Sequence, residues 1–428
     1  MNRKILLLAL FSLLLSCAWR KPVSALVGVP GPDSLPVTDS FIQQLLGQRP
    51  DLFDSLLQNN GQWNISIIYT QVDRKGGNEP VLTHYRYNID PARYFYPAST
   101  VKMPAALLSL QKLNELGIEG LDKHTTMITG AGYPGLTPVY NDPTAEDGRP
   151  SIAHYIKKIF LVSDNDAFNR LYEFLGQEYF NQTLRKMGYA SANVVHRLEV
   201  SLTEEQNRHT NPVSFYDRNA KLVYSQPLTK SNLVYPQEKL LLGKGYYKAG
   251  QVVNAPFDFT TKNRLSLQDL HNMLISVMLP EAVPAAQRFR LKEEDYRFLY
   301  DYMSRKPAES RFPQYDSSYS DAYVKFLLYG GNGPMPDPAI RIFNKPGDAY
   351  GFLTDVAYIV DLERGVEFFL SATISCNSDE IFNDNRYDYD SVGFPFMKNL
   401  GRLIYDHELA RKKKRQPDLS KFRINYNR

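Results

Sequence analysis

Apolar residues along the chain follow two different periods. Spacings of three and four residues predict helices over 41–57, 152–162, 167–175, 176–188, 265–278, 293–303, 322–328 and 396–410. Runs rich in β-branched and aromatic residues predict strands over 63–72, 83–88, 340–345, 352–360 and 366–374. We therefore expect an α/β (α+β) fold with one antiparallel sheet of about five strands, which come from both chain ends and are flanked by helices. An inserted, mostly helical subdomain would occupy about residues 117–320.

Composition narrows the function classes. The 428 residues are 43% hydrophobic and 22% charged, a globular balance that allows one large domain or two ordinary ones. The formal charge of +4 gives no argument for nucleic-acid binding. No His and Cys residues gather at metal-ligand spacing, and His154, His196 and His209 are scattered, so we expect no metal and no cofactor.

The N-terminus has the pattern of a secretory leader. Arg3 and Lys4 precede an apolar run over 5–15, which is too short to span a bilayer comfortably. The run ends in Leu-Leu-Ser-Cys17, which resembles a bacterial lipobox, so residues 1–17 would be a lipoprotein signal peptide and Cys17 the lipidated residue. The alternative is an ordinary signal peptide with a cysteine nearby. We expect export from a bacterial cell and a lipid anchor in the envelope, in the periplasm or at the cell surface.

Three further segments complete the organisation. Residues 18–39 are predicted to be a linker from the membrane to the domain at 40–410. The basic stretch that opens 411–428 is expected to be a solvated tail, although it is also suited to anionic lipid head groups. The second cysteine, Cys376, lies in a predicted strand and is expected to be a small buried apolar residue. No pattern suggests an oligomer, and we expect a monomer.

The segment Ser99-Thr-Val-Lys102 carries the first chemistry. It opens an apolar, helix-forming stretch, so Ser99 and Lys102 share a helix face one turn apart. A serine hydroxyl is a poor nucleophile until a base takes its proton, and a lysine can be that base if burial lowers its pKa. The tetrapeptide alone is common by chance, so its meaning depends on whether further motifs lie downstream at matching spacing.

Two later motifs supply that context. Ser163-Asp164-Asn165 begins 64 residues after Ser99, and Lys345-Pro346-Gly347 lies on a predicted strand that is followed by two more strands and a terminal helix. Together with Ser99-Thr-Val-Lys102, this set resembles the class A β-lactamases and the related penicillin-binding serine enzymes, which carry S-x-x-K, S-D-N and K-T-G in this order. The resemblance covers about residues 40–410.

The resemblance implies a role for each residue of the first two motifs. Ser99 would attack a carbonyl and become acylated, and Lys102 would act as, or assist, its general base. Ser163 would relay a proton to the leaving nitrogen. Asn165 would hold the amide side chain of the substrate and help to position Lys102.

The third motif implies substrate contacts. Lys345 would supply positive charge from the edge strand. Asp348 follows Gly347, and its backbone N–H would form an oxyanion hole together with the backbone N–H of Ser99. Glu199, in Glu-Val-Ser-Leu-Thr, lies 36 residues after Ser163 and corresponds to the glutamate that activates the deacylating water in class A enzymes. The alternative is an exposed loop residue, with Glu204 and Glu205 as neighbouring competitors.

Several positions depart from the family pattern. Pro346 replaces the threonine whose hydroxyl binds the substrate carboxylate, and Asp355 stands where many class A enzymes have an arginine for the same carboxylate. Arg341 is a candidate replacement for that arginine. Thr203 replaces the asparagine near the deacylating water, and the stretch 204–261 is much longer than the family connection there, which suits either a lid or a surface elaboration.

Three interpretations of function remain open. The leading one is a β-lactamase that opens β-lactams through an acyl-enzyme on Ser99. The second keeps this chemistry for a cell-wall D-alanyl peptide, an ester or an amide, and Pro346 and Asp355 favour it. The third is a surface-tethered binding protein with little catalysis, which does not explain why all the polar motif residues are retained.

Overall fold

The computed structural model describes residues 36–90, 92–236 and 238–427. The expected signal peptide, Cys17 and most of the linker lie outside these residues, so their assignments remain predictions. Val37, at the end of the expected linker, already pairs with Ile89 through two backbone hydrogen bonds of 2.8 and 3.0 Å. Within the described residues, no helix is both long and apolar enough to cross a membrane.

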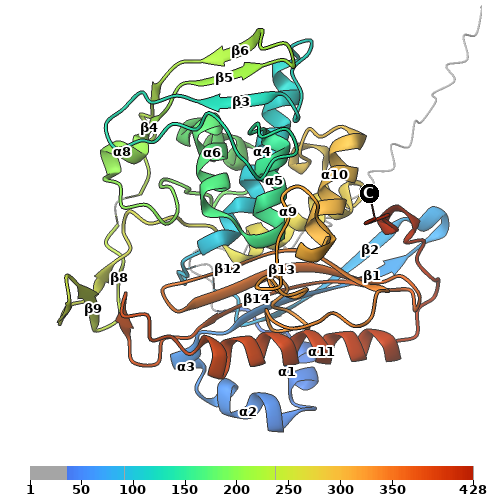
Figure 1. The fold of residues 1–428 in the computed structure, drawn as a ribbon. Coiled ribbons are helices and arrows are strands. Elements are labelled where there is room, and N and C mark those ends of the chain that lie inside the picture. The colour runs from blue at the N-terminus through green and yellow to red at the C-terminus, as the bar shows by residue number, and fades with distance from the viewer. Residues whose placement is uncertain (1–35, 91, 237, 428) are drawn as a thin grey trace, which may run out of the picture.

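The centre of the molecule is the predicted five-stranded antiparallel sheet (Figure 1). The strands lie in the order β12-β13-β14-β1-β2. They are β1 (Ser66–Arg74), β2 (Pro80–Tyr87), β12 (Ile340–Ala349), β13 (Phe352–Asp361) and β14 (Val366–Ser375). Strand β1 pairs with β14, with Ile67 opposite Ala372, so the two ends of the chain are joined within one sheet.

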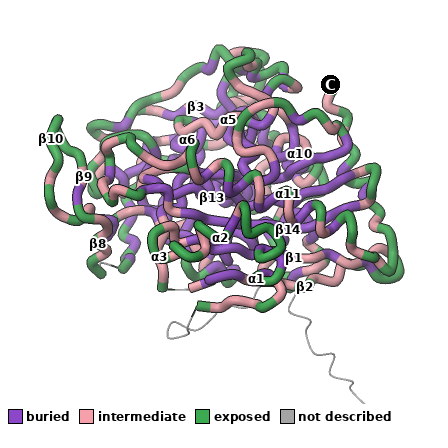
Figure 2. Tube along the Cα trace, turned by 90° about the horizontal axis from the view of Figure 1, so that it is seen from below, coloured by how far each residue is buried: buried purple, intermediate pink, exposed green. Residues whose placement is uncertain are grey.

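Each face of the sheet is covered by its own helices. Side chains alternate along a strand, so Ile68 and Val72 face one core while Ile67 and Tyr69 face the other. The helical subdomain covers the first face, and the N-terminal helices with α11 cover the second (Figures 1 and 2). The helices are α1 (Ser40–Leu46), α2 (Pro50–Gln58), α3 (Asn60–Trp63), α4 (Lys102–Leu116), α5 (Ile152–Val162), α6 (Asn165–Leu175), α7 (Gln177–Lys186), α8 (Glu204–Arg208), α9 (Leu267–Met278), α10 (Glu293–Ser304) and α11 (Phe394–Ala410).

The structure also contains small sheets that the sequence pattern did not predict, and all of their strands except β15 lie in the subdomain. The segments are β3 (Thr126–Thr129), β4 (His209–Thr210), β5 (Val213–Tyr216), β6 (Leu222–Gln226), β7 (Thr229–Lys230), β8 (Leu241–Leu242), β9 (Gly245–Lys248), β10 (Gln251–Val253), β11 (Phe257–Asp258) and β15 (Ile381–Phe382). Strands β3, β5 and β6 form one sheet at the outer edge of the subdomain (Figure 1). Most of these strands belong to the long stretch 204–261.

Two predicted helices differ in the structure. The stretch 41–57 forms two helices because the chain turns after Leu46 and restarts at Pro50, a residue suited to the first turn of a helix. The stretch 322–328 forms turns and no helix. There the Lys325 ammonium is buried and donates to the carbonyl oxygens of Met303 and Ile342, at 2.7 and 2.9 Å, so tertiary contacts override the local helical pattern.

The C-terminal stretch 411–427 packs on the domain through its apolar residues. Leu419 and Phe422 are buried in the core above the sheet. The aromatic ring of Phe422 lies 5.2 Å from those of Phe343 and Tyr358.

Lys412, Lys414 and Arg415 are exposed. Arg411 and Lys413 are largely buried and lie 3.0 and 3.6 Å from Glu408, so the expectation of a solvated basic run is wrong for these two residues.

Candidate active site

The segment that carries Ser99 lies at the edge of the sheet, between the sheet and the helical subdomain. Residues Ala98–Val101 form a short 3-10 helix that continues directly into α4 at Lys102. This places Ser99 one turn before Lys102, as the spacing predicted. Ser99 is partly exposed, whereas Lys102 has no exposed surface.

The Lys102 ammonium is the centre of the polar contacts. Its Nζ donates to Ser99 Oγ at 2.7 Å, to Asn165 Oδ1 at 2.6 Å and to Ser163 Oγ at 3.1 Å, and it also contacts the Ser163 carbonyl oxygen. An ammonium has three N–H donors, so these four oxygens satisfy it completely. After loss of one proton, the free lone pair would be available to accept a proton from Ser99.

Burial makes that loss easier. Desolvation lowers the pKa of Lys102 from 10.5 to about 7, against the opposing effect of the carboxylates of Asp164, Asp348 and Glu199. A fully buried amine with no carboxylate in direct contact gains less from being charged than it does in water. Near neutral pH a large share of Lys102 is thus neutral, the form that a general base requires.

Local backbone geometry brings Ser163 and Asn165 to Lys102. Helix α5 ends at Ser163, which has a left-handed φ of 61° and turns the chain sharply. Asp164 then caps α6 by accepting from Ala167 N at 2.7 Å. The residues on either side of this cap, Ser163 and Asn165, consequently face the same amine.

Lys345 comes from the opposite side, on the edge strand β12. It is 1% exposed, and its Nζ donates to Ser163 Oγ at 2.8 Å and to the Pro346 carbonyl at 2.7 Å. Burial, together with the nearby charge of Lys102, lowers the pKa of Lys345 well below its usual value. Ser163 Oγ therefore connects the two amines.

Gly347 allows the strand to approach the nucleophile. A Cβ at this position would lie 2.6 Å from Ser99 N and 2.8 Å from Thr100 N, both backbone atoms. No side chain fits in that space. The next residue, Asp348, is exposed and lines the same pocket as Ser99. The oxyanion-hole role of its backbone N–H stays a prediction.

Glu199 also reaches this group. It has a left-handed φ of 57° and is exposed, and its Oε2 accepts a hydrogen bond from Asn165 Nδ2. Two residues before Glu199, Arg197 forms a buried ion pair of 2.7 Å with Glu173, and this pair fixes the loop. The loop is thus held at a defined position beside Lys102 and its partners.

The two competing glutamates point elsewhere. Glu204 accepts from Arg208 at 3.0 Å and from Tyr235 at 2.6 Å, and Glu205 accepts from Lys230 at 2.6 Å. Neither lines the pocket that contains Ser99. Thr203, which departs from the family pattern, caps α8.

The substituted carboxylate anchors do not face the site. Asp355 lies opposite Pro346 in the β12–β13 pairing, on the sheet face away from Lys345. It accepts from Leu327 N at 3.0 Å and from Asn344 Nδ2 at 2.9 Å, and burial raises its pKa to about 6.

Arg341 does not replace the missing arginine. Its guanidinium forms two hydrogen bonds of 3.0 Å with Glu309 and lies 3.8 Å from the ring centre of Tyr426. These contacts hold Arg341 four residues before Lys345 on β12, which is about 13 Å along the strand. The suggestion that Arg341 compensates is therefore wrong.

The pocket in front of Ser99 has a volume of about 410 Å³. It is lined by Tyr96, Ala98, Ser99, Asn165, Leu198, Glu199, Asp348, Ala349, Tyr350, Asn383, Asn385, Tyr387 and Tyr389. Among these lining residues there is no lysine or arginine. The wall of tyrosine and asparagine side chains from 383–389 was missed from the sequence, although the run Asn-Asp-Asn-Arg-Tyr-Asp-Tyr before the last helix was a visible signal.

The long stretch 204–261 supports this wall. Strand β9 pairs with β15, whose residues Ile381 and Phe382 immediately precede the asparagines that line the pocket. At Gly243 the contact is so close that a Cβ would lie 2.5 Å from the Glu380 carbonyl oxygen. This part of the stretch therefore packs against the pocket wall and supports it.

Comparison with known proteins agrees with the motifs. Three solved structures share low identity with the chain: a β-lactamase from Sphaerobacter thermophilus (12% identity, 88% of this chain and 100% of that chain, TM-score 0.45), one from Xanthomonas campestris (13%, 85% and 98%, 0.47) and PBP-A (16%, 87% and 98%, 0.45). No curated protein sequence matches the chain. The model of the beta-lactamase enzyme family matches residues 52–407. The chain therefore belongs to the beta-lactamase enzyme family.

Proposed function

We propose that the protein is a serine hydrolase that opens β-lactams through an acyl-enzyme on Ser99, which water then hydrolyses. The observation that carries this proposal is the contact of 2.7 Å between Lys102 Nζ and Ser99 Oγ, made by an amine whose pKa burial lowers to about 7. In this geometry the amine can take the serine proton as the oxygen attacks the lactam carbonyl.

The remaining residues suit the later steps. Ser163 Oγ lies between the two amines, where it can pass the proton from Lys102 to the leaving lactam nitrogen. The backbone N–H groups of Ser99 and Asp348 would stabilise the oxyanion, and one such donor is worth about two to three powers of ten in rate. Glu199 would take a proton from the water that attacks the acyl-enzyme and restores free Ser99.

The test is the intact mass of the protein over time with a penicillin and a cephalosporin, with drug loss followed in parallel. An adduct on the wild type that is absent from Ser99→Ala supports the nucleophile. Glu199→Ala should acylate normally and accumulate the adduct, whereas Glu205→Ala, an exposed glutamate paired with Lys230, should behave like the wild type. Wild-type turnover by Glu199→Ala would refute the deacylation role.

A second substrate class is favoured by one observation. The lining of the pocket contains no arginine or lysine, Pro346 has no hydroxyl, and Asp355 lies behind the sheet. A site without partners for a carboxylate discriminates against it. Esters and amides without a carboxylate are therefore the alternative acyl donors, whereas a D-alanyl peptide would bring a terminal carboxylate into the same site. If no drug adduct forms, acylation of Ser99 by a neutral chromogenic ester would select this alternative.

We also propose export and anchoring through a lipid on Cys17. The leader pattern of residues 3–17 supports this location in the cell envelope. Labelled palmitate should be incorporated into the wild type, and this label should be lost in Cys17→Ser. Equal labelling of both proteins would overturn the assignment.

A further inference from the structure

The pocket in front of Ser99 holds negative charge without a matching cation. The carboxylates of Glu199 and Asp348 line it, and its lining contains no lysine or arginine. Both carboxylates raise the pKa of Lys102, so both act on the amine beside the nucleophile. The Asp348 carboxyl group forms neither a hydrogen bond nor an ion pair with any described residue. The pocket therefore presents a carboxyl group without a partner to the molecule that enters it.

The two amines near this pocket do not cancel its charge. Lys102 has no exposed surface and Lys345 is 1% exposed, and neither lines the pocket. Burial lowers the pKa of both amines, which weakens the positive charge behind Ser99. Desolvation also raises the pKa of the Asp348 carboxyl group above its usual value, so a cation beside it would favour its ionised form. A substrate that brings a cation would supply a contact that the chain itself does not make.

Two tyrosines of the pocket wall suit a cation. Tyr387 and Tyr389 line the pocket, and their ring centroids are 5.4 Å apart. Their hydroxyl groups hold the backbone, because Tyr387 Oη accepts from Asn383 N at 2.9 Å and Tyr389 Oη accepts from Gly351 N at 2.8 Å. These bonds fix the position of both rings. An aromatic ring fixed in this way attracts a cation that approaches its face.

The loop that carries these tyrosines is acidic. Residues 379–390 include five acidic residues and one arginine, Arg386, which is exposed and does not line the pocket. None of the five acidic side chains forms an ion pair with a described residue. Lys262 also lies outside the lining, 5.5 Å from the ring centroid of Tyr350, so a third tyrosine of the pocket already holds a cation of the chain. A wall with this excess of negative charge attracts cations and repels anions.

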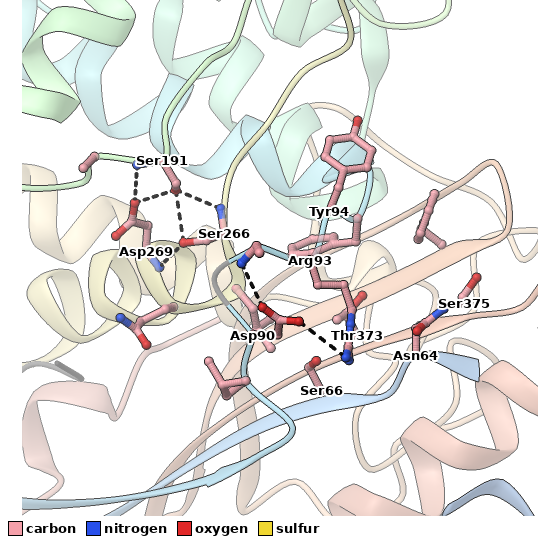
Figure 3. Close-up of a pocket in the computed structure, with 17 residues that line it drawn as sticks. Asn64, Ser66, Asp90, Arg93, Tyr94, Ser191, Ser266, Asp269, Thr373 and Ser375 are labelled. Carbon is pink, nitrogen blue, oxygen red and sulfur yellow. Dashed lines mark hydrogen bonds and ion pairs between the residues drawn. The ribbon is translucent and has the colours of Figure 1, made fainter. Parts of the chain in front are cut away.

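The neighbouring cavity in Figure 3 has a different arrangement of charge. It has a volume of about 390 Å³ and shares no lining residue with the pocket in front of Ser99. Its Asp90 Oδ2 lies 3.6 Å from Arg93 Nη2. Its Asp269 accepts hydrogen bonds of 2.9 and 2.5 Å from Ser191. The carboxyl groups of that cavity already have partners, in contrast to Asp348.

We propose that the acyl donor of Ser99 carries a positive charge. Asp348 and the rings of Tyr387 and Tyr389 select this charge. The inference rests on the acyl-enzyme chemistry proposed above and adds the charge of the substrate. The pocket volume of about 410 Å³ is in the range of small-molecule sites, about 300–1,000 Å³. Among β-lactams, one with an ammonium group would be preferred over one without it.

Three amides of similar size test the charge. The cation is 4-(trimethylammonio)butanamide, its neutral carbon analogue is 5,5-dimethylhexanamide, and the anion is adipic acid monoamide. Each is titrated into the full chain with Ser99→Ala, and ligand-detected NMR gives the Kd. We expect the cation to bind at least about tenfold more tightly than the neutral amide, and the anion to bind more weakly than either. Raising NaCl from about 0.05 to about 0.5 M should reduce this preference, because salt screens the charges.

Two matched pairs of variants, each made in the Ser99→Ala chain, locate the selection. Asp348→Asn keeps the shape of the side chain and should reduce the cation preference to about threefold or less. Asp54→Asn, on the exposed surface of α2, should leave the preference unchanged. Tyr387→Leu should reduce the preference by about two- to fivefold, whereas Tyr387→Phe retains the ring and should keep most of it.

The 4-nitrophenyl esters of the same three acids separate charge selection from chemistry. They are mixed with the wild type, with Ser99→Ala as the blank, and the burst of nitrophenolate gives the acylation rate. If the amides show the preference but no ester acylates Ser99, the proposed hydrolase chemistry fails and the charge selection stands. If the esters acylate Ser99 and the three amides bind equally, the charge selection is refuted and the hydrolase stands.

Two further results would refute the charge selection: no saturable binding of the cationic amide, or an equal preference in Asp348→Asn and Asp54→Asn. The comparison of the three amides needs no variant of the pocket wall, so it decides even if Asp348→Asn does not fold.

Discussion

Acylation of Ser99 should follow the titration of Lys102. Burial lowers the pKa of this amine from 10.5 to about 7, a difference of about 5 kcal/mol in the free energy of holding the charge. If the neutral amine is the base, roughly a tenth of the molecules are active at pH 6 and roughly nine tenths at pH 8. The acylation rate should therefore rise roughly tenfold between these pH values and level off above pH 8.

The assay is stopped-flow acylation by a fluorescent penicillin from pH 5.5 to 9.5, under single-turnover conditions. Asp348→Asn keeps the backbone N–H but removes a carboxylate that raises the pKa of Lys102, so the midpoint should move to lower pH. Asp54→Asn, on the exposed surface of α2, is the matched control and should leave the midpoint unchanged.

Two outcomes would refute this reasoning. A rate that does not change across the range would show that proton transfer to Lys102 does not limit acylation. A midpoint near the ordinary lysine pKa would show that burial does not control the amine. Folding must be checked at each pH by circular dichroism, because loss of structure at low pH would imitate the same rise.

Three further changes test other parts of the structure. Gly347→Ala would place a Cβ 2.6 Å from Ser99 N, so we expect a loss of about 1–3 kcal/mol in unfolding free energy and up to about a hundredfold slower acylation; unchanged acylation would show that the close approach is unimportant. Asp355→Arg should not restore a carboxylate anchor but should destabilise the fold by about 3–5 kcal/mol, since it removes the acceptor of Asn344 and buries a new cation; a folded variant with a lower KM for penicillin would contradict this. Phe422→Ala should cost about 3–5 kcal/mol in urea unfolding, and a loss below about 1 kcal/mol would mean that the C-terminal stretch is loosely attached.

A residue or element could be predicted from the sequence where the interactions that determine its position are local. Ser99 and Lys102 were predictable because one helical turn fixes their separation. Ser163 was predictable because its motif ends one helix and starts the next. The strands were recognised with ends shifted by a few residues, since β-branched runs mark the buried parts of a strand and not the hydrogen-bonded ends.

Other features depend on tertiary contacts that no local pattern encodes. The wall at 383–389 is placed by the pairing of β15 with β9, more than one hundred residues earlier in the chain. The turns at 322–328 follow from the burial of Lys325, and the packing of Phe422 depends on three aromatic rings from distant elements. In each case a distant partner decides between conformations that the local sequence allows equally.

The pairing of β1 with β14 has a consequence for how the chain folds. Ile67 and Ala372 are neighbours in the sheet but are separated by about three hundred residues of chain, and closing such a loop costs about 5 kcal/mol in chain entropy. The hairpin of β1 and β2 can form early. The edge of β1 that pairs with β14 stays unpaired until the hairpin of β13 and β14 has been synthesised. An unpaired edge of this kind is prone to join other chains. We therefore expect refolding to be slow and its yield to fall as the protein concentration rises.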